Sequence, residues 1–174
     1  VMNHQPFTVC ANLPYYITTP IIMKLLEQKL PIKRIVVMVQ KEVAERMVAE
    51  PGHKIYGALS VSVQYYTQPQ MLFEISPKCF MPAPEVTSAV VAMDVRQQPP
   101  VDLIDEKRFF QVVKAAFQQR RKTFSNALKN TGMSKEQIAQ VLEKTGIDGK
   151  RRGETLSLQE FADIANAWSE IIRG

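Results

Sequence analysis

Residues 7–16 read FTVCANLPYY and join a strand signal to a chemically distinctive loop. The apolar and β-branched residues before Asn12 predict a β-strand. Asn12, Pro14 and Tyr15 follow at its carboxyl end, where α/β proteins place ligand-binding groups. An amide, a stiffened backbone and an aromatic ring suit a flat heterocycle with an exocyclic amine, and adenine is the simplest. The same run also fits a plain strand-to-helix turn with two tyrosines packed in the core.

Methylation of such an amine would give each loop residue a role. The lone pair of adenine N6 is delocalised into the ring, so the amine is a poor nucleophile until acceptors hold its hydrogens. The side-chain oxygen of Asn12 and the carbonyl of Leu13 can be those acceptors, because a residue before proline favours an extended conformation. Tyr15 would stack on the base, and stacking contributes about 1–3 kcal/mol per base. The loop therefore predicts catalysis by positioning, without an ionised general base.

Strand and helix patterns alternate through the first hundred residues, which predicts an α/β fold. Residues 35–39 are all apolar and predict a buried parallel strand within 33–40. The other expected elements are strands at 6–12, near 71–75 and at 87–95, helices at 19–30, 41–49 and about 59–66, and a proline loop at 77–84.

The sequence QQPP at residues 97–100 marks the expected domain boundary, because strand patterns end there. We therefore expect one domain over residues 1–97 and a second, all-helical domain over residues 98–174. Ser134 with Gln137, and Ser157 with Glu160, have the spacing of helix capping boxes.

Four ordered segments resemble one enzyme family. They are NLPY at residues 12–15, VQKEVA at 39–44 leading to YGALSV at 56–61, FMPAPEVTSAV at 80–90 and AFQQRRKTFSN at 116–126. In order and spacing they resemble the ribosomal RNA adenine N6,N6-dimethyltransferases, and the last segment is most similar to the small-subunit (16S) enzymes of the KsgA/RsmA type. The resemblance extends from near residue 7 to near residue 172.

This resemblance implies the C-terminal half of a Rossmann-like class I methyltransferase sheet followed by a small helical rRNA-binding domain. The implied reaction transfers methyl groups from S-adenosylmethionine to N6 of two adjacent adenosines in a hairpin loop near the 3′ end of small-subunit rRNA. Asn12 would also touch the methionine end of the cofactor, and Phe80 would close the second face of the base. The implied catalytic residues are Asn12, Leu13, Pro14, Tyr15 and Phe80.

Two other functions stay open. The chain can act as a non-catalytic module that binds RNA or assists ribosome assembly, since the family recognises an immature small subunit. The related large-subunit rRNA adenine methyltransferases are an enzymatic alternative, which the segment Arg120-Arg121-Lys122-Thr123 disfavours.

The family's glycine-rich βαβ region, which holds most of the cofactor, has no counterpart in this sequence. All seven glycines lie after residue 51, in the wrong spacing for such a turn. We therefore expect an N-terminally truncated, catalytically incomplete fragment that lacks the main S-adenosylmethionine-binding region. An unpaired sheet edge would then favour self-association of the fragment.

Composition is compatible with a protein that binds nucleic acid. The formal charge is +5 and the pI is about 9.3, which favours polyanionic partners such as rRNA. Cys10 and Cys79 form no disulfide framework or zinc pattern, and Cys10 is expected in the core. No stretch predicts a membrane span or a secretion signal, so we expect a cytoplasmic protein with no membrane partner and no metal.

Basic residues of the second domain predict an RNA surface. If residues 107–130 form one continuous helix, Lys114, Arg121, Lys122 and Lys129 share a face opposite the apolar stripe. A second cluster lies between Gly149 and Gly153, where a flexible backbone can fit irregular RNA. A solvated surface is the alternative for any single lysine. The predicted RNA-binding residues are Lys114, Arg120, Arg121, Lys122, Lys129, Lys150, Arg151 and Arg152.

Overall fold

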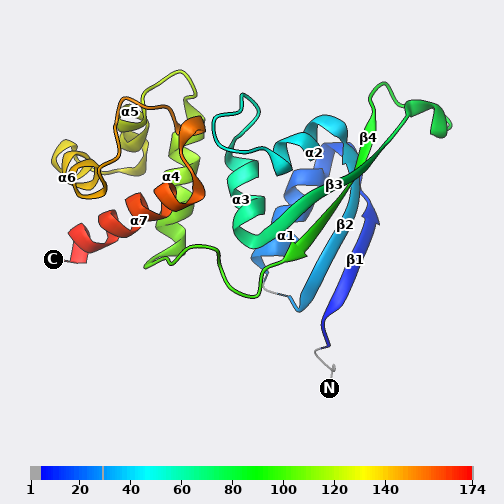
Figure 1. Ribbon diagram of the computed structural model, residues 1–174, viewed down its shortest axis with the longest axis horizontal. Helices are drawn as coiled ribbons and strands as arrows, with labels where there is room; N and C mark the ends of the chain where they lie inside the picture. The colour runs from blue at the N-terminus through cyan, green and yellow to red at the C-terminus, as the bar shows by residue number, and fades with distance from the viewer. Residues whose placement is uncertain (1–4, 29, 174) are drawn as a thin grey trace. The chain divides into compact units, whose positions relative to one another are not determined.

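The computed structural model describes residues 5–28 and 30–173, which form two compact units (Figure 1). The first unit contains the chain up to residue 49 together with residues 62–99. The second contains residues 50–61 together with the chain from residue 100 onward. The predicted domain ranges, 1–97 and 98–174, differ from these units in residues 50–61. The remaining break, at Pro99–Pro100, falls within the proline-rich segment.

The first unit is built on a four-stranded sheet in the order β1-β2-β4-β3. β1 (Phe7–Asn12) runs parallel to β2 (Ile32–Gln40). β4 (Ser88–Val95) lies between β2 and β3 (Thr67–Ile75) and is antiparallel to both (Figure 1). This mixed sheet with its connecting helices confirms the predicted α/β class.

Three helices connect these strands: α1 (Thr18–Glu27), α2 (Lys41–Val48) and α3 (Ala58–Tyr66). α2 packs against β2, β3 and β4. In β2, residues 35, 37 and 39 are fully buried, whereas residues 36 and 38 are only half-buried. The expected buried parallel strand is therefore parallel to one neighbour only, and one of its faces is more exposed than the other.

Cys10 is exposed, so its predicted place in the core is wrong. Side chains alternate between the two faces of a strand. After Phe7, which is also exposed, Thr8, Cys10 and Asn12 are the exposed residues of β1, while Val9 and Ala11 are half-buried. The apolar composition of the strand did not indicate which residues share the covered face.

The second unit is helical and has an aromatic core. Phe109, Phe124 and Phe161 are fully buried. The ring of Phe161 lies 6.2 Å from that of Phe124 and 5.9 Å from that of Phe117. The helices of this unit are α4 (Glu106–Gln118), α5 (Phe124–Leu128), α6 (Lys135–Thr145) and α7 (Leu158–Arg173).

Both predicted capping boxes are present. In the first, Ser134 Oγ accepts from the Gln137 amide at 3.2 Å, and Gln137 Oε1 accepts from the Ser134 amide at 2.9 Å. In the second, Ser157 Oγ accepts from the Glu160 amide, and a Glu160 carboxylate oxygen accepts from the Ser157 amide. Each box satisfies amide donors that a helix start otherwise leaves unpaired.

Residues 50–61 belong to the second unit because a large side chain of this segment, that of Tyr56, is buried there. Tyr56 is 1% exposed, and its ring lies edge-on to Phe117 at 5.8 Å. Burial raises the pKa of the Tyr56 phenol well above its usual range. The amide of Gly52 donates to the Glu154 carbonyl at 2.8 Å. A reading of local patterns alone could not reveal this long-range packing.

Within the part of the chain that the structure describes, no helix combines the length and apolar character that a membrane span needs.

Candidate functional site

The loop after β1 is fixed to the sheet at its first residues. Asn12 is the last residue of β1 and pairs in register with Met38 of β2. The Leu13 amide donates to the Met38 carbonyl at 3.4 Å, and the Leu13 side chain is buried. Pro14 has φ −58° and ψ 131°, so the backbone is extended where it leaves the strand. These contacts place Asn12 and Leu13 at the carboxyl end of the sheet.

A short turn then carries the loop into α1. The Pro14 carbonyl accepts from Thr18 Oγ1 at 3.0 Å and from the Ile17 amide at 3.2 Å. Tyr15–Ile17 forms a 3₁₀ turn before α1. The hydroxyl of Tyr15 shares a hydrogen bond with Ser88 Oγ at the start of β4. The segment is thus a strand-to-helix turn, and Tyr15 is half-buried rather than enclosed in the core.

The proline loop between β3 and β4 supplies the opposite aromatic group. Ser76 Oγ accepts from the Lys78 amide at the start of the 3₁₀ turn Pro77–Cys79. Phe80 follows with an extended backbone, and the Met81–Pro82 peptide bond is cis. The chain re-enters the sheet at Ser88, whose register partner is Gln40 at the carboxyl end of β2.

These segments line an open cavity of about 350 Å³. It brings together all five residues predicted to be catalytic, from two loops that are far apart in the sequence. Met38, Pro82 and Pro84 also line it, and these three were missed as site residues. The alternating prolines were visible in the sequence, whereas Met38 looked like an ordinary strand residue. The lining residues are Asn12, Leu13, Pro14, Tyr15, Met38, Phe80, Pro82 and Pro84.

The chemistry of the lining suits a flat, neutral ring. The apolar surface comes from two aromatic rings, from Met38 and from two prolines of the loop between β3 and β4. Asn12 contributes an amide. No carboxylate, histidine or glycine is among the lining residues that the structure describes. The volume is near the lower end of the range for ligand pockets, about 300–1,000 Å³. An apolar lining with one amide therefore suits a nucleobase.

The basic residues of the second unit do not share one helix face. α4 ends at Gln118, residues 119–123 form a turn, and α5 begins at Phe124. The premise of a continuous helix over residues 107–130 is therefore wrong. The turn allows Phe124 to be fully buried, and its amide donates to the Arg151 carbonyl at 2.7 Å. No glycine or proline marks this break in the sequence.

Arg120 holds the turn through backbone contacts. Its guanidinium donates to the carbonyl oxygens of Lys54, at 3.0 Å, and Tyr56, at 2.5 Å. Both acceptors belong to residues 50–61 of the second unit. The side chain of Arg120 therefore fastens this segment to the end of α4.

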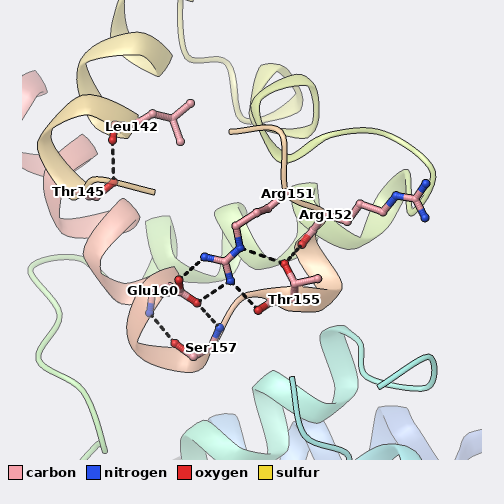
Figure 2. Close-up of polar contacts among 7 residues, drawn as sticks. All are labelled: Leu142, Thr145, Arg151, Arg152, Thr155, Ser157 and Glu160. Carbon is pink, nitrogen blue, oxygen red and sulfur yellow. Dashed lines mark hydrogen bonds and ion pairs between the residues drawn. The ribbon is translucent and has the colours of Figure 1, made fainter. Parts of the chain in front are cut away.

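Arg151 is likewise engaged inside the protein (Figure 2). Its guanidinium forms a bidentate ion pair with Glu160, in which Nη2 lies 3.1 Å from Oε2. Nη2 also donates to the Thr155 carbonyl at 2.7 Å. The hydrogen bond from Arg151 holds the pKa of the Glu160 carboxyl below its usual value. In Figure 2 the side chain of Arg152 extends away from this network.

Gly149 and Gly153 serve close packing. A Cβ on Gly153 would lie 2.8 Å from the carbonyl oxygen of Ala116, and one on Gly149 would lie 2.9 Å from Ser125 Cβ. The Gly149 carbonyl also accepts from the Ser125 amide at 2.9 Å. These contacts contradict the expectation of a freely flexible loop, because the segment is fastened to α4 and α5.

The remaining predicted cations are exposed. The two amide-to-carbonyl bonds from Phe124 and Ser125 bring the turn at 119–123 next to the segment 149–153. Lys129 donates to the side-chain oxygen of Asn126 at 2.8 Å. Five others enter no salt bridge found in the described part of the chain: Lys114, Arg121, Lys122, Lys150 and Arg152.

Comparison with protein families identifies the chain. The family model described as "Ribosomal RNA adenine dimethylase" matches residues 1–170. The chain belongs to this family. Relatives named "Ribosomal RNA small subunit methyltransferase A" include one from Geobacillus sp. (strain WCH70), 53% identical over 94% of this chain, and one from Bacillus cytotoxicus, 51% identical over 94%. The chain spans 58% and 57% of the length of these two relatives.

Solved structures confirm the fold of this dimethylase family member. A dimethyladenosine transferase from Plasmodium falciparum has a TM-score of 0.77 at 23% identity, and the match covers 90% of this chain and 64% of that one. The 23S rRNA methyltransferase ErmE has a TM-score of 0.69 at 19% identity, covering 95% of this chain and 66% of that one. At these identities the likeness supports the Rossmann-like methyltransferase fold and no finer assignment.

Proposed function

We propose that the whole protein dimethylates N6 of two adjacent adenosines in a hairpin loop near the 3′ end of small-subunit rRNA, and that this chain supplies the pocket for the target base. The observation that carries the proposal is the single cavity that collects Asn12, Leu13, Pro14, Tyr15 and Phe80. The relatives' names support the small-subunit substrate.

In this proposal the chain activates the amine by positioning it. The side-chain oxygen of Asn12 and the carbonyl of Leu13 accept the two N6 hydrogens, which draws the nitrogen toward tetrahedral geometry and frees its lone pair. Pro14 stiffens the backbone that aims these oxygens. Tyr15 and Phe80 hold the two faces of the base and keep water from the amine. After methyl transfer the methylated amine carries a positive charge, and its extra proton passes to solvent water as the base leaves the pocket, so no residue of the pocket needs to ionise.

S-adenosylmethionine would supply the electrophilic methyl group. Asn12 fits its reactive end, because an amide can touch both the base and the methionine portion from the carboxyl end of β1. The cavity lining offers neither the glycine turn nor the carboxylate that holds an adenosyl group. We therefore assign to this chain the base side of the site and to other residues of the whole protein most of the cofactor contact.

The second unit is proposed to hold the RNA backbone. Phosphate contacts depend on accessible cations. Arg120 and Arg151 are occupied by contacts within the unit, so we assign them to shaping the surface. The proposed phosphate ligands are Lys114, Arg121, Lys122, Lys129, Lys150 and Arg152. The proposed partner is the immature small subunit in the cytoplasm.

Self-association through a sheet edge is a further part of the proposal. β1 lies at one end of the strand order, and Phe7 on it is exposed. Edge pairing between two chains would cover this strand. Sedimentation at micromolar concentration tests the idea, and a stable monomer would exclude it.

The decisive experiment measures methyl transfer from S-adenosylmethionine to small subunits that lack the modification, scored as dimethyladenosine by nucleoside mass spectrometry. The 174-residue chain and the full-length Geobacillus relative are assayed in parallel. Product from the chain supports the enzyme proposal directly. Subunit binding without product from the chain, while the full-length relative is active, is the result expected of a catalytically incomplete half that holds RNA. Binding without product from both proteins supports the non-catalytic alternative. Product on large subunits in place of small ones overturns the substrate assignment.

A further inference from the structure

A buried serine that does not line the cavity is hydrogen-bonded to Tyr15, an aromatic residue that does. Ser88 is fully buried at the first position of β4, and its Oγ shares a hydrogen bond with the Tyr15 hydroxyl, in which either group can donate. Tyr15 lines the cavity, whereas Ser88 does not. None of the roles proposed above uses the serine. The bond joins two segments that are 73 residues apart.

Ser88 is held on both sides by the sheet. Its register partners are Gln40 of β2 and Ile75 of β3. The Lys41 amide donates to the carbonyl of the preceding residue, Thr87, at 2.9 Å. A residue at this position in the central strand cannot shift without disturbing two ladders. The Ser88 hydroxyl is therefore a fixed point next to the loops.

Tyr15 has weaker support from its own backbone. It begins a three-residue 3₁₀ turn, in which the Ile17 amide donates to the Pro14 carbonyl at 3.2 Å. The Tyr15 ring turns about two side-chain bonds. A hydrogen bond to the hydroxyl fixes the far end of the side chain and so restricts rotation about Cα–Cβ. Rotation about Cβ–Cγ leaves the hydroxyl oxygen in place, so the serine fixes where the ring lies and not its turn about that axis.

We infer that Ser88 is a positioning residue that holds the Tyr15 ring at the place in the pocket where it receives the target base. The inference rests on the proposed function, because it assumes that Tyr15 stacks on that base. Ser88 touches neither the base nor the amine in this arrangement and acts through Tyr15. Its effect is preorganisation, since a ring already in place loses less rotational freedom when the base enters.

The two hydroxyls can be removed with different side effects. Ser88→Ala leaves the Tyr15 hydroxyl on a half-buried side chain that water can reach. Tyr15→Phe leaves the fully buried Ser88 hydroxyl without this partner, which also destabilises the fold. The double variant removes both groups and relieves that penalty. Ser88→Ala is therefore the cleaner probe, and the three variants form a thermodynamic cycle.

The matched control is Ser169→Ala. Ser169 is also fully buried, and its hydroxyl donates to the Ala165 carbonyl within α7 of the second unit. This variant removes the same atoms at the same burial, away from the pocket. It reports any loss that follows from deleting a buried hydroxyl in general.

The experiment uses the 174-residue chain and a short single-stranded RNA with 2-aminopurine at the target position. Stacking quenches the fluorescence of 2-aminopurine, and this base lacks the N6 amine, so the signal isolates stacking from the contacts of Asn12. Anisotropy of a dye at the RNA end measures overall binding separately. Ser88→Ala and Tyr15→Phe should each lower the stacked-to-unstacked ratio by about three- to tenfold, with overall affinity nearly unchanged. The double variant should lose no more than either single one.

Each failure has a distinct meaning. If Tyr15→Ala quenches as well as the wild type, the proposed stacking is wrong and the inference falls with it. If Tyr15→Ala abolishes quenching but Ser88→Ala does not reduce it, the stacking survives and the role of Ser88 is excluded. An equal loss in Ser169→Ala shows a general fold defect and also overturns the positioning role.

A measurement without RNA tests the inference by itself. With ¹³C-labelled tyrosine, nuclear Overhauser contacts report the position of the Tyr15 ring in the free chain. Ser88→Ala should weaken the contacts between this ring and the side chains of the cavity lining, while Ser169→Ala leaves them intact. Unchanged contacts in Ser88→Ala would overturn the inference whether or not the RNA binds.

Discussion

The loop at residues 12–16 and the loop at residues 149–153 use their characteristic residues in opposite ways. In the first, Asn12, Leu13, Pro14 and Tyr15 all line a cavity. In the second, the two glycines allow close packing and Arg151 pairs with Glu160. Only the side chains beside these residues, Lys150 and Arg152, are exposed. A motif in a sequence therefore marks residues under constraint, and the structure decides whether the constraint is ligand binding or packing.

The difference follows from what each loop must satisfy. The Asn12 loop leaves a strand whose backbone is already paired, so two hydrogen bonds to the Pro14 carbonyl suffice to shape the turn and its side chains face the cavity. The segment 149–153 has no strand to hold it. It gains its shape from backbone bonds to α5 and from an ion pair to α7. Gly149, Arg151 and Gly153 therefore serve packing and ion pairing within the protein.

We expect the largest loss of activity from a substitution at Asn12. Asn12→Ala in the whole protein removes a proposed acceptor of the amine and should lower the rate of methyl transfer by about 10²–10³-fold, the usual loss when one preorganised polar group is removed. RNA affinity, measured by anisotropy, should change little. Asn130→Ala, at an exposed position in the second unit, is the matched control. A rate within a few-fold of the wild type would remove Asn12 from the chemistry and reduce its loop to a structural turn.

Gly153→Ala tests the packing role of the second loop. The added Cβ would meet the Ala116 carbonyl oxygen and Cβ, each at 2.8 Å, so backbone must shift. We expect the free energy of unfolding in urea to fall by about 1–3 kcal/mol. Gly57→Ala is the control, because its Cβ would meet only the Arg120 guanidinium, at 3.9 Å. Equal stability of the two variants would mean that the loop tolerates the movement and is not held by packing.

Local patterns predicted the elements of the first unit well. Strands at 6–12 and 33–40 and the helix from Lys41 follow from residue type and spacing, and the structure has them within a few residues. The capping boxes were also predictable, since they depend on residues three apart. The Asn12 loop was found because its residues are chemically distinctive. These features share a short range in the sequence.

The misses all depend on long-range packing. Residues 50–61 join the second unit through Tyr56, and the helix break at 119–123 exists to bury Phe124 and to place Arg120. Met38 lines the cavity because β2 lies beside β1. The exposure of Cys10 depends on which face of β1 is covered. The neighbouring residues in the sequence do not indicate which distant residues pack against each of these positions. Local patterns therefore could not predict these contacts.

Glu160→Gln tests whether Arg151 is structural. The pKa of Glu160 in the folded state is lowered mainly by its hydrogen bond with Arg151. The ion pair therefore stabilises the fold fully at pH values above the ordinary pKa of 4.5, and this stabilisation is lost as the pH falls below 4.5 and through the lowered pKa. At neutral pH the variant should be less stable by about 1–2 kcal/mol. The difference from the wild type should shrink as pH falls below 4.5, as followed by urea unfolding across pH.

The control for this pair is an exposed one. Glu170→Gln removes the carboxylate that pairs with Lys144, and both side chains are about half exposed. Exposed pairs contribute little, so this variant should stay close to the wild type at every pH. Similar pH profiles for the two variants would show that Arg151 is no better held than a surface lysine, and the contrast between the loops would weaken.

The smallest effect concerns the exposed cations of the second loop. Each phosphate contact to single-stranded RNA contributes about 0.7 to the slope of log affinity against log salt. Arg152→Gln should therefore reduce that slope by about this amount and weaken binding about fivefold at 0.1 M salt. Arg151→Gln should destabilise the fold but leave the slope nearly unchanged, because its guanidinium is already neutralised by Glu160. Both are measured by anisotropy titrations at several salt concentrations, at a temperature where each variant is folded. If Arg151→Gln reduces the slope as much as Arg152→Gln, Arg151 leaves Glu160 to bind RNA. The second loop would then resemble the first, with its conspicuous residue used on the ligand.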